Sequence, residues 1–502
     1  MQKGLAVTVG DTNAAELTGV RGWEIGSLGL AFLVSLSLYL ARGYEAVGYV
    51  SPLTILAVLG FANWRMVKDN PAALWTPLFA FRTAAAVFLG FGGFLTVNLS
   101  VEAQARYFSE LTYTEAEAAY VFLVWLTGIF LTLLGCFLAS KVSPWHRDLQ
   151  QEAQQVKNPP TLRLGLIFFL AGLAFYLVIE LPRALGFADI GIIPNAIAQP
   201  FQAALAVGVF LISLWALEKG KAALLAIPVV ITLASLAGFI GLNKTGVILP
   251  LIFFVLAFLY RKVSIVRVAL VVVLLVSAFS VLQPMVAHAR DLAGEDLGTT
   301  PTLAERYELY QDFFQEGNLA REESNVETDF LRFGHTHVAA FVIDRYQTGM
   351  RSDELEGALG ALVPRILWPD KPVVTQGAEN LYFMVSGRYG SALATTTFAD
   401  IYWNGGWLAL VIICLVWGAL MWIGTTTAFD IVRKQDWVLM PYVLLVFRIG
   451  LSQESAFVVA IFIPTVMAAI AYFMFKWGKP LIALKPQTGG GPRNAHRLSM
   501  HQ

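Results

Sequence analysis

The chain has 502 residues, of which 57% are hydrophobic and 14% are charged, and its mean hydropathy is +0.63. Soluble globular domains carry about 25% charged residues, so this composition excludes a soluble protein and indicates an integral membrane protein. The formal net charge is zero, which argues against a nucleic-acid partner.

Apolar runs that could cross a bilayer recur along the chain, and each such span needs about 20 residues. We predict an all-α integral membrane protein with about twelve transmembrane helices, at 23–41, 46–63, 76–98, 118–140, 163–185, 196–217, 222–241, 245–260, 264–286, 404–424, 436–452 and 456–475. The second, seventh, eighth and eleventh runs are short or closely spaced, so ten spans with two re-entrant segments is the alternative. The polar leader, 1–22, shows no small-residue cleavage site, and we interpret the first run as a retained span.

Basic residues in the short loops predict the orientation, because Lys and Arg concentrate in cytoplasmic loops. With a cytoplasmic N-terminus, every inside connection is more basic than the outside connections beside it. This pattern also places the C-terminus in the cytoplasm. The inside loops hold Arg65 and Lys68; Lys141, Arg147, Lys157 and Arg163; Lys219 and Lys221; Arg261, Lys262 and Arg267; and Arg433 and Lys434.

Three side chains within the apolar runs need an interpretation. Arg82 is expected to extend its guanidinium to the inner membrane surface, as long basic side chains do. Cys136 and Cys414 lie in apolar runs, so we expect packing or lipid-facing roles for them and not a disulfide or a metal pair.

One long polar connection, 287–397, joins the ninth and tenth spans on the outer face. Thr302 and Glu305 have capping-box spacing, so a helix is expected to begin there. The segments HTHVAAFVIDRY and LEGALGALV predict two further helices. We therefore divide the chain into a cytoplasmic leader, nine spans, a helical outer loop, three spans and a disordered cytoplasmic tail, at 1–22, 23–286, 287–397, 398–476 and 477–502.

The stretch VPRILWPDKPV, 363–373, combines three prolines with charged residues and a tryptophan. Proline restricts its own φ and the residue before it, so the stretch should be stiff and extended. Trp368 suits the membrane interface. Such a bracket would hold Arg365 and Lys371 at fixed positions above the membrane, although a surface loop pinned by prolines is the alternative.

The order of motifs around this bracket resembles a known family. A helix ending in DRY, the pattern P-R-x-x-W-P-x-K-P at 364–372 and FADIYWNGGWLALV at 398–411 are similar to the oligosaccharide repeat-unit polymerases of the O-antigen polymerase (Wzy) class. Asp400 stands where glutamate is commoner in that family, and the glycines at 405 and 406 are adjacent. The resemblance is specific over about 340–411 and otherwise concerns topology only.

The resemblance implies a bacterial inner-membrane enzyme with a GT-C-like polytopic architecture and a periplasmic active site. Such an enzyme moves a growing glycan from undecaprenyl pyrophosphate onto the non-reducing end of a new lipid-linked repeat unit. The expected partners are the lipid-linked donor and acceptor, the bilayer, a chain-length regulator and a flippase. No cofactor or metal is expected, because the leaving group already carries the activation.

Departure of a lipid pyrophosphate requires cations near the outer face. The candidate catalytic residues are Asp400, Arg365 and His337. The candidates for binding substrate or pyrophosphate are Lys244, Arg290, Lys371, Arg388, Arg448, Tyr402 and Trp368. Two of these basic residues also have a purely structural interpretation. Lys244 could simply end two short spans, and Arg448 could pair with Glu454.

The acceptor hydroxyl needs a base, and the sequence offers two kinds. Asp400 is the first choice, because it precedes a span and lies close to glycines that could let a substrate approach. His337 follows, with His335, although two residues spaced two apart cannot share one helix face. A satisfied surface histidine is the alternative, and a third zinc ligand at a sensible spacing is lacking.

Two other functions remain possible from the sequence. A ligase of similar build would move the polymer onto lipid A core or a protein. A flippase or secondary carrier would change no covalent bond, but such transporters often contain two matching halves, and we find no internal repeat.

Overall fold

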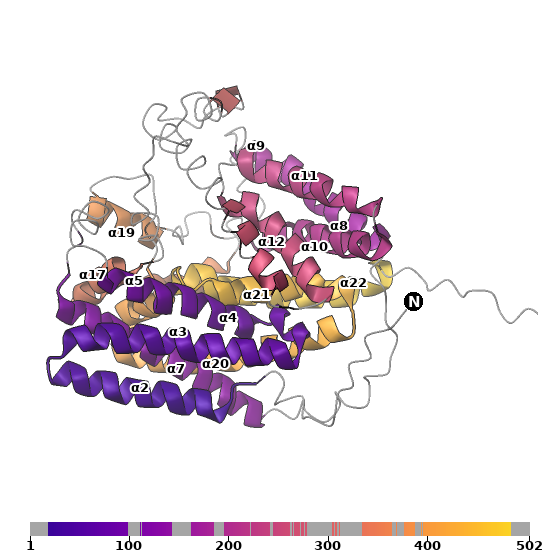
Figure 1. Ribbon diagram of the computed structural model, residues 1–502. Helices are drawn as coiled ribbons and strands as arrows, with labels where there is room; N and C mark the ends of the chain where they lie inside the picture. The colour runs from indigo at the N-terminus through magenta and orange to yellow at the C-terminus, as the bar shows by residue number, and fades with distance from the viewer. Residues whose placement is uncertain are drawn as a thin grey trace, which may run out of the picture.

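The computed structural model describes residues 19–98, 111, 113–142, 162–184, 195–220, 222–240, 244–261, 334–363, 368, 376–386, 393 and 395–482, with short stretches between 264 and 311. Within these residues every regular element is a helix. Figure 1 shows most of the long helices running roughly parallel, as spans of one bilayer would. The prediction of an all-α membrane protein is confirmed at this level.

The long helices of the first group come from both ends of the chain and lie side by side in Figure 1. A π-helical segment, 85–91, joins α4 to α5, so these two elements form one continuous rod. The members are α2 (Gly22–Leu40), α3 (Tyr44–Asp69), α4 (Pro77–Ala84), α5 (Gly92–Asn98), α7 (Glu115–Val142), α20 (Thr397–Arg433), α21 (Met440–Leu451) and α22 (Ile463–Ile482).

A second group of helices occupies one side of the first (Figure 1). It consists of α8 (Leu162–Phe175), the short α9 (Leu181–Ala184), α10 (Asn195–Lys219), α11 (Ala226–Ile240) and α12 (Lys244–Arg261). Aromatic rings connect α10 to the first group. The Phe210 ring of α10 lies 4.7 Å from that of Trp75 and 6.0 Å from that of Trp437, between ring centroids.

Eight helices in the described part of the chain are long and apolar enough to span a membrane. Four shorter apolar helices, at Ala223–Leu236, Leu249–Tyr260, Val266–Leu275 and Trp437–Leu451, coincide with the seventh, eighth, ninth and eleventh predicted spans. Every predicted span therefore corresponds to an apolar helix. The count of twelve crossings stays a prediction.

Small residues allow α7 and α20 to pack closely, which explains why they form the centre of the bundle. A Cβ atom at Gly418 of α20 would overlap the Thr132 carbonyl oxygen, and one at Gly135 of α7 would overlap the Leu415 carbonyl oxygen. Association of helices in membranes depends on such close packing, because lipid is as apolar as the side chains. This contact fixes the position of α20 within the fold.

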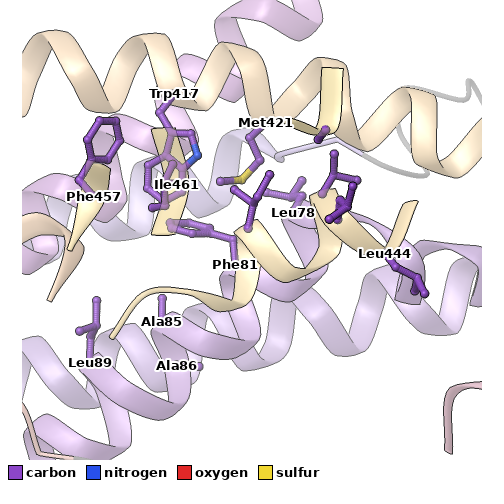
Figure 2. Close-up of a cluster of buried hydrophobic side chains, with 14 of the residues drawn as sticks. Leu78, Phe81, Ala85, Ala86, Leu89, Trp417, Met421, Leu444, Phe457 and Ile461 are labelled. Atoms are coloured by element: carbon purple, nitrogen blue, oxygen red, sulfur yellow. The ribbon is translucent and has the colours of Figure 1, made fainter. Parts of the chain in front are cut away.

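The core around α20 is filled by large apolar side chains from α4 and η7 (Val458–Phe462), as Figure 2 shows. Phe81 of α4 meets Trp417 of α20 edge-on, with ring centroids 5.4 Å apart. Gly450 of α21 lies so close to α4 that a Cβ there would overlap the Pro77 carbonyl oxygen. The middle of α20 is therefore held in a closely packed framework.

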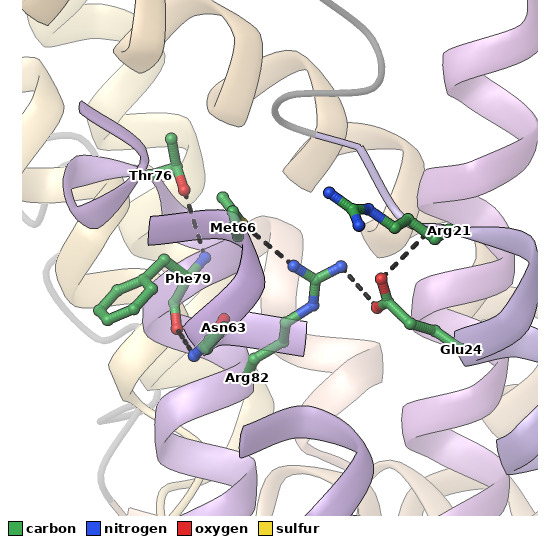
Figure 3. Close-up of polar contacts among 7 residues, drawn as sticks. All are labelled: Arg21, Glu24, Asn63, Met66, Thr76, Phe79 and Arg82. Carbon is green, nitrogen blue, oxygen red and sulfur yellow. Dashed lines mark hydrogen bonds and ion pairs between the residues drawn. The ribbon is translucent and has the colours of Figure 1, made fainter. Parts of the chain in front are cut away.

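Arg82 does not extend to the membrane surface, and that prediction is wrong. Its side chain is 1% exposed, and its Nη2 lies 2.6 Å from Oε2 of Glu24 on α2. The Arg82 Nη1 group also contacts the Met66 sulfur at 3.1 Å, and the Arg21 backbone N–H donates to Glu24 (Figure 3). A paired carboxylate lets the guanidinium stay inside the bundle, where an unpaired charge would be costly.

Candidate functional site

The first turn of α20 holds Asp400, and the local sequence explains why a helix begins there. Thr396 caps the helix, because its hydroxyl accepts the Ala399 backbone N–H at 3.4 Å. Asp400 then lies in the first turn, where the helix dipole favours a carboxylate. The sequence placed the tenth span at 404–424, but the helix begins earlier, at Thr397. Asp400 and Tyr402 are therefore helical.

Hydrogen bonds from the connection between α21 and η7 hold the first turn of α20 in place. The Phe457 backbone N–H donates to Oδ2 of Asp400 at 2.8 Å, and Asp400 is 1% exposed. The Thr397 hydroxyl donates to the carbonyl oxygens of Ser452 and Ser455, at 3.1 and 3.0 Å. The Asp400 carboxylate is thus buried, oriented and supported by a backbone donor.

The short helix α18 (Glu354–Ala361) docks against the same turn of α20. The Leu355 backbone N–H donates to Oδ1 of Asn404 at 3.0 Å, and Nδ2 of Asn404 donates to the Asp400 carbonyl oxygen at 2.9 Å. This docking brings Glu354 near Asp400. Burial, and then the negative charges of Asp400 and Asp353, raise the pKa of the Glu354 carboxyl to about 8.

Glu354 was not among the residues selected from the sequence. It opens a helix among other acidic residues, a position that normally reflects only the helix dipole. Its neighbour in space, Asp400, lies far along the chain. The two residues come together because the Leu355 backbone N–H, next to Glu354, bonds to Asn404. No sequence pattern predicts that contact.

A third helix, α19 (Gln376–Ser386), lies beside Glu354. A Cβ atom at Gly377 would overlap the Glu354 carboxylate, so glycine makes room for that group. This helix was not predicted from the sequence, although buried Leu381 and Val385 have the i, i+4 spacing of a helix face.

Aromatic side chains surround the other face of the α20 start. The hydroxyl of Tyr402 lies 2.8 Å from that of Tyr120 on α7, and the Trp407 indole N–H donates to the Tyr120 hydroxyl at 3.0 Å. The Tyr346 ring of α17 (Thr336–Gln347) lies 5.1 Å from that of Tyr402. Tyr402 is buried, whereas Trp407 is 39% exposed and is the part of this cluster that meets the surroundings.

The glycine pair after Asn404 interrupts α20. Gly406 has φ of 61° and ψ of −151°, which only glycine adopts readily. A Cβ atom at this position would also overlap the Tyr346 hydroxyl. The glycine therefore makes space for Tyr346 of α17, whereas the sequence had suggested space for a substrate.

Gly406→Ala is expected to destabilise the protein by about 1–3 kcal/mol, because the residue is both strained and crowded. Thermal unfolding in detergent measures the change. Gly60→Ala is the matched control, since no atom lies within 4 Å of its added Cβ. Equal melting temperatures for the two variants would contradict this interpretation of the break.

The two histidines lie at the start of α17, which confirms the helix predicted from HTHVAAFVIDRY. The His337 ring is 1% exposed and meets the Tyr113 ring edge-on, at 4.8 Å between centroids. Burial lowers the pKa of both imidazoles to about 4, so both are neutral at pH 7. Neither is the surface residue that the sequence allowed as an alternative.

The remaining predicted site residues are only partly covered by the structure. Arg448 is exposed near the end of α21, and no ion pair with Glu454 occurs among the described residues. Trp368 is 44% exposed and lies against Gly360 of α18. Lys244 begins α12, but its side chain lies outside the described residues, as do Arg290, Arg365, Lys371 and Arg388.

No group of three or more His, Cys, Asp or Glu side chains that could hold a metal ion is found in the described ranges. The prediction of a helix beginning at Thr302 also falls mostly outside those ranges. The site that the structure does describe consists of two carboxyl groups, Glu354 and Asp400, with aromatic side chains beside them.

Comparison with known proteins gives one match. A family model described as a domain of unknown function, DUF8712, matches residues 115–431, which is more than half of the chain. Neither the curated proteins nor the solved structures yielded a match. The matched region runs from α7 into α20 and contains both Glu354 and Asp400. The chain therefore belongs to the DUF8712 family.

Proposed function

We propose that the protein is a glycosyltransferase that polymerises lipid-linked oligosaccharide repeat units at the outer face of a bacterial inner membrane. In this proposal it transfers a growing glycan from undecaprenyl pyrophosphate to the non-reducing end of a new lipid-linked unit. The termini are cytoplasmic, and a flippase and a chain-length regulator act before and beside it.

The observation that carries this proposal is the buried carboxyl centre at the start of α20. Asp400 lies in the segment whose motifs resemble the repeat-unit polymerases, and Phe457 fixes its carboxylate by a 2.8 Å hydrogen bond. Burying a carboxyl group costs free energy, whereas a carboxyl group on a surface loop would stay hydrated and avoid that cost. An acid–base role in glycosyl transfer accounts for that cost.

Two further features suit a glycan substrate. Trp407 is 39% exposed beside the carboxyl centre, and an aromatic face can pack against a sugar ring. Arg448 is exposed near the end of α21. The segment that follows α21 supports Asp400, so the Arg448 guanidinium could bind the departing pyrophosphate there. Arg365, Lys371, Arg388, Arg290 and Lys244 are proposed as further cations.

The test is lengthening of the lipid-linked repeat unit by the purified protein in detergent. The substrate is the lipid fraction from cells that make the repeat unit but lack this protein. We expect a ladder of longer lipid-linked glycans without ATP or added divalent metal. Transfer only to lipid A core or to a protein would instead identify a ligase, and flux across liposomes with no new covalent bond would identify a transporter.

A further inference from the structure

We propose that Glu354 and Asp400 act as one acid–base pair that holds a single proton, and that Glu354 is the member that takes the proton of the acceptor hydroxyl. This inference rests on the proposed function, which it deepens by assigning the two carboxyl groups different roles. Asp400 is then a positioning residue that tunes Glu354.

The geometry brings the two groups together from independent directions. Asn404 bonds to the Leu355 backbone N–H on one side and to the Asp400 carbonyl on the other, which ties the start of α18 to one turn of α20. Phe457 holds the Asp400 carboxylate from the third side. Asp400 is 1% exposed, whereas Glu354 is only partly buried, so Glu354 is the member that a substrate can reach.

The Glu354 carboxylate also has an unused oxygen. Its Oε2 atom is buried and accepts no hydrogen bond from any described residue. A buried oxygen without a partner costs about 1–3 kcal/mol, so it needs an explanation. The same carboxylate occupies space that only a glycine at position 377 leaves open. A proton held on this carboxyl group lowers that cost, because a neutral group is less costly to bury than a carboxylate.

Charge around the pair favours a shared proton. Two carboxylates close together in a poorly solvated place cannot both ionise easily. The raised pKa of Glu354, about 8, agrees with this. Arg351, which lies just before α18, is bonded to Glu356 at the surface. Among the described residues, the neighbouring segments carry the acidic groups Asp353, Glu356, Glu379 and Glu454, together with the basic groups Arg345 of α17 and Arg448 of α21.

The chemical step balances without a further reactant. When the shared proton lies on Asp400, ionised Glu354 removes the proton from the acceptor hydroxyl. The acceptor oxygen forms a bond to C1 of the donor sugar, and the bond between C1 and the pyrophosphate oxygen breaks with its electron pair on that oxygen. Both carboxyl groups are then protonated, and Glu354 returns one proton to the solvent.

The first experiment measures lengthening against pH for the wild type, Glu354→Gln and Asp400→Asn. The wild-type rate should rise with pH toward about pH 8, because Glu354 must be ionised to act as the base. Glu354→Gln should lose at least about 100-fold in rate, because acid–base groups contribute about 10²–10⁴-fold. In Asp400→Asn the rise should move to lower pH, because the negative charge that helps to raise the Glu354 pKa is gone.

Three further variants separate the effect of charge from an effect on folding. Glu356→Gln removes an exposed carboxylate from the same helix and should lengthen glycans at the wild-type rate. Gly377→Ala displaces the Glu354 carboxylate without changing any charge and should be slow. Gly357→Ala adds the same methyl group on α18 with no atom within 4 Å, and should be as active as the wild type.

A second experiment does not depend on turnover. A hydrophobic carbodiimide adds only to protonated carboxyl groups, and it should label Glu354 at pH 7 while leaving Glu356 unlabelled. In Asp400→Asn the pH midpoint for Glu354 labelling should fall, although burial keeps it above that of an ordinary glutamate. No labelling at pH 7, or an unchanged midpoint, overturns the shared proton.

The outcomes distinguish this inference from the proposed function. Full lengthening by Glu354→Gln would overturn the role of Glu354 and leave the polymerase proposal standing. A wild-type protein that never lengthens a glycan, yet is labelled at Glu354 as described, would overturn the polymerase and leave the shared proton supported.

Discussion

Asp400→Asn is expected to slow chain lengthening by at least about 10-fold, while the protein accumulates in the membrane at its normal level, because loss of the neighbouring charge makes Glu354 a weaker base. The amide keeps an oxygen that can accept the Phe457 N–H, which the carboxylate accepts at 2.8 Å. The variant therefore changes charge and proton affinity with little change in shape. Asp400→Ala should also be slow, but it leaves that N–H without a partner and should be less stable as well.

Asp430→Asn is the matched control for this substitution. Asp430 lies near the other end of the same helix and pairs with Lys434 at 2.9 Å, at the partly exposed C-terminal end of α20. Exposed ion pairs of this kind contribute little, so lengthening and stability should both stay at wild-type values. The measurement is the length distribution of lipid-linked glycan from cells and from purified protein. Long polymer made by Asp400→Asn would remove Asp400 from the site.

Arg82→Ala is expected to produce the largest loss of stability of any single substitution considered, about 3–5 kcal/mol by analogy with broken buried pairs. The substitution leaves the Glu24 carboxylate 2% exposed inside the bundle, with no guanidinium 2.6 Å away. Thermal unfolding in detergent and the amount of protein recovered from membranes measure the effect. Arg65→Ala, at an exposed position, should change stability by less than about 0.5 kcal/mol.

The double substitution Arg82→Met with Glu24→Gln separates pairing from the mere presence of charge. Because neither residue is then charged, the double variant should recover most of the stability that Arg82→Ala loses. The coupling between the two positions follows from the double-mutant cycle. If the effects of the single substitutions simply add, the two side chains do not stabilise each other and the contact in Figure 3 has no energetic role.

Hydropathy predicted the membrane helices well, because each span satisfies its backbone hydrogen bonds within itself and needs only apolar length. The helices α17 and α18 were also predicted, since their apolar residues recur at helical spacing. The early start of α20 was missed, because Thr396 caps a helix two turns before the apolar run begins. Capping and hydropathy are separate signals, and the prediction used the second alone.

The site was predicted only in part, and the reason lies in sequence separation. Asp400 was found because it stands beside a recognisable motif. Glu354 and the partner of Arg82 were missed, because each is brought to its place by packing between helices that are distant in the chain. Asn404 joins α18 to α20, and Glu24 reaches Arg82 across 58 residues. Patterns within one helix carry no information about such contacts.

The separation between Glu24 and Arg82 also has a consequence for how the chain is made. A ribosome adds about 5–20 residues per second, so about 3–12 s pass between synthesis of the acid and synthesis of the arginine 58 residues later. During that interval the first helix carries a carboxyl group with no counterion. We therefore expect α2 to reach its final position in the bundle only after α4 has been synthesised.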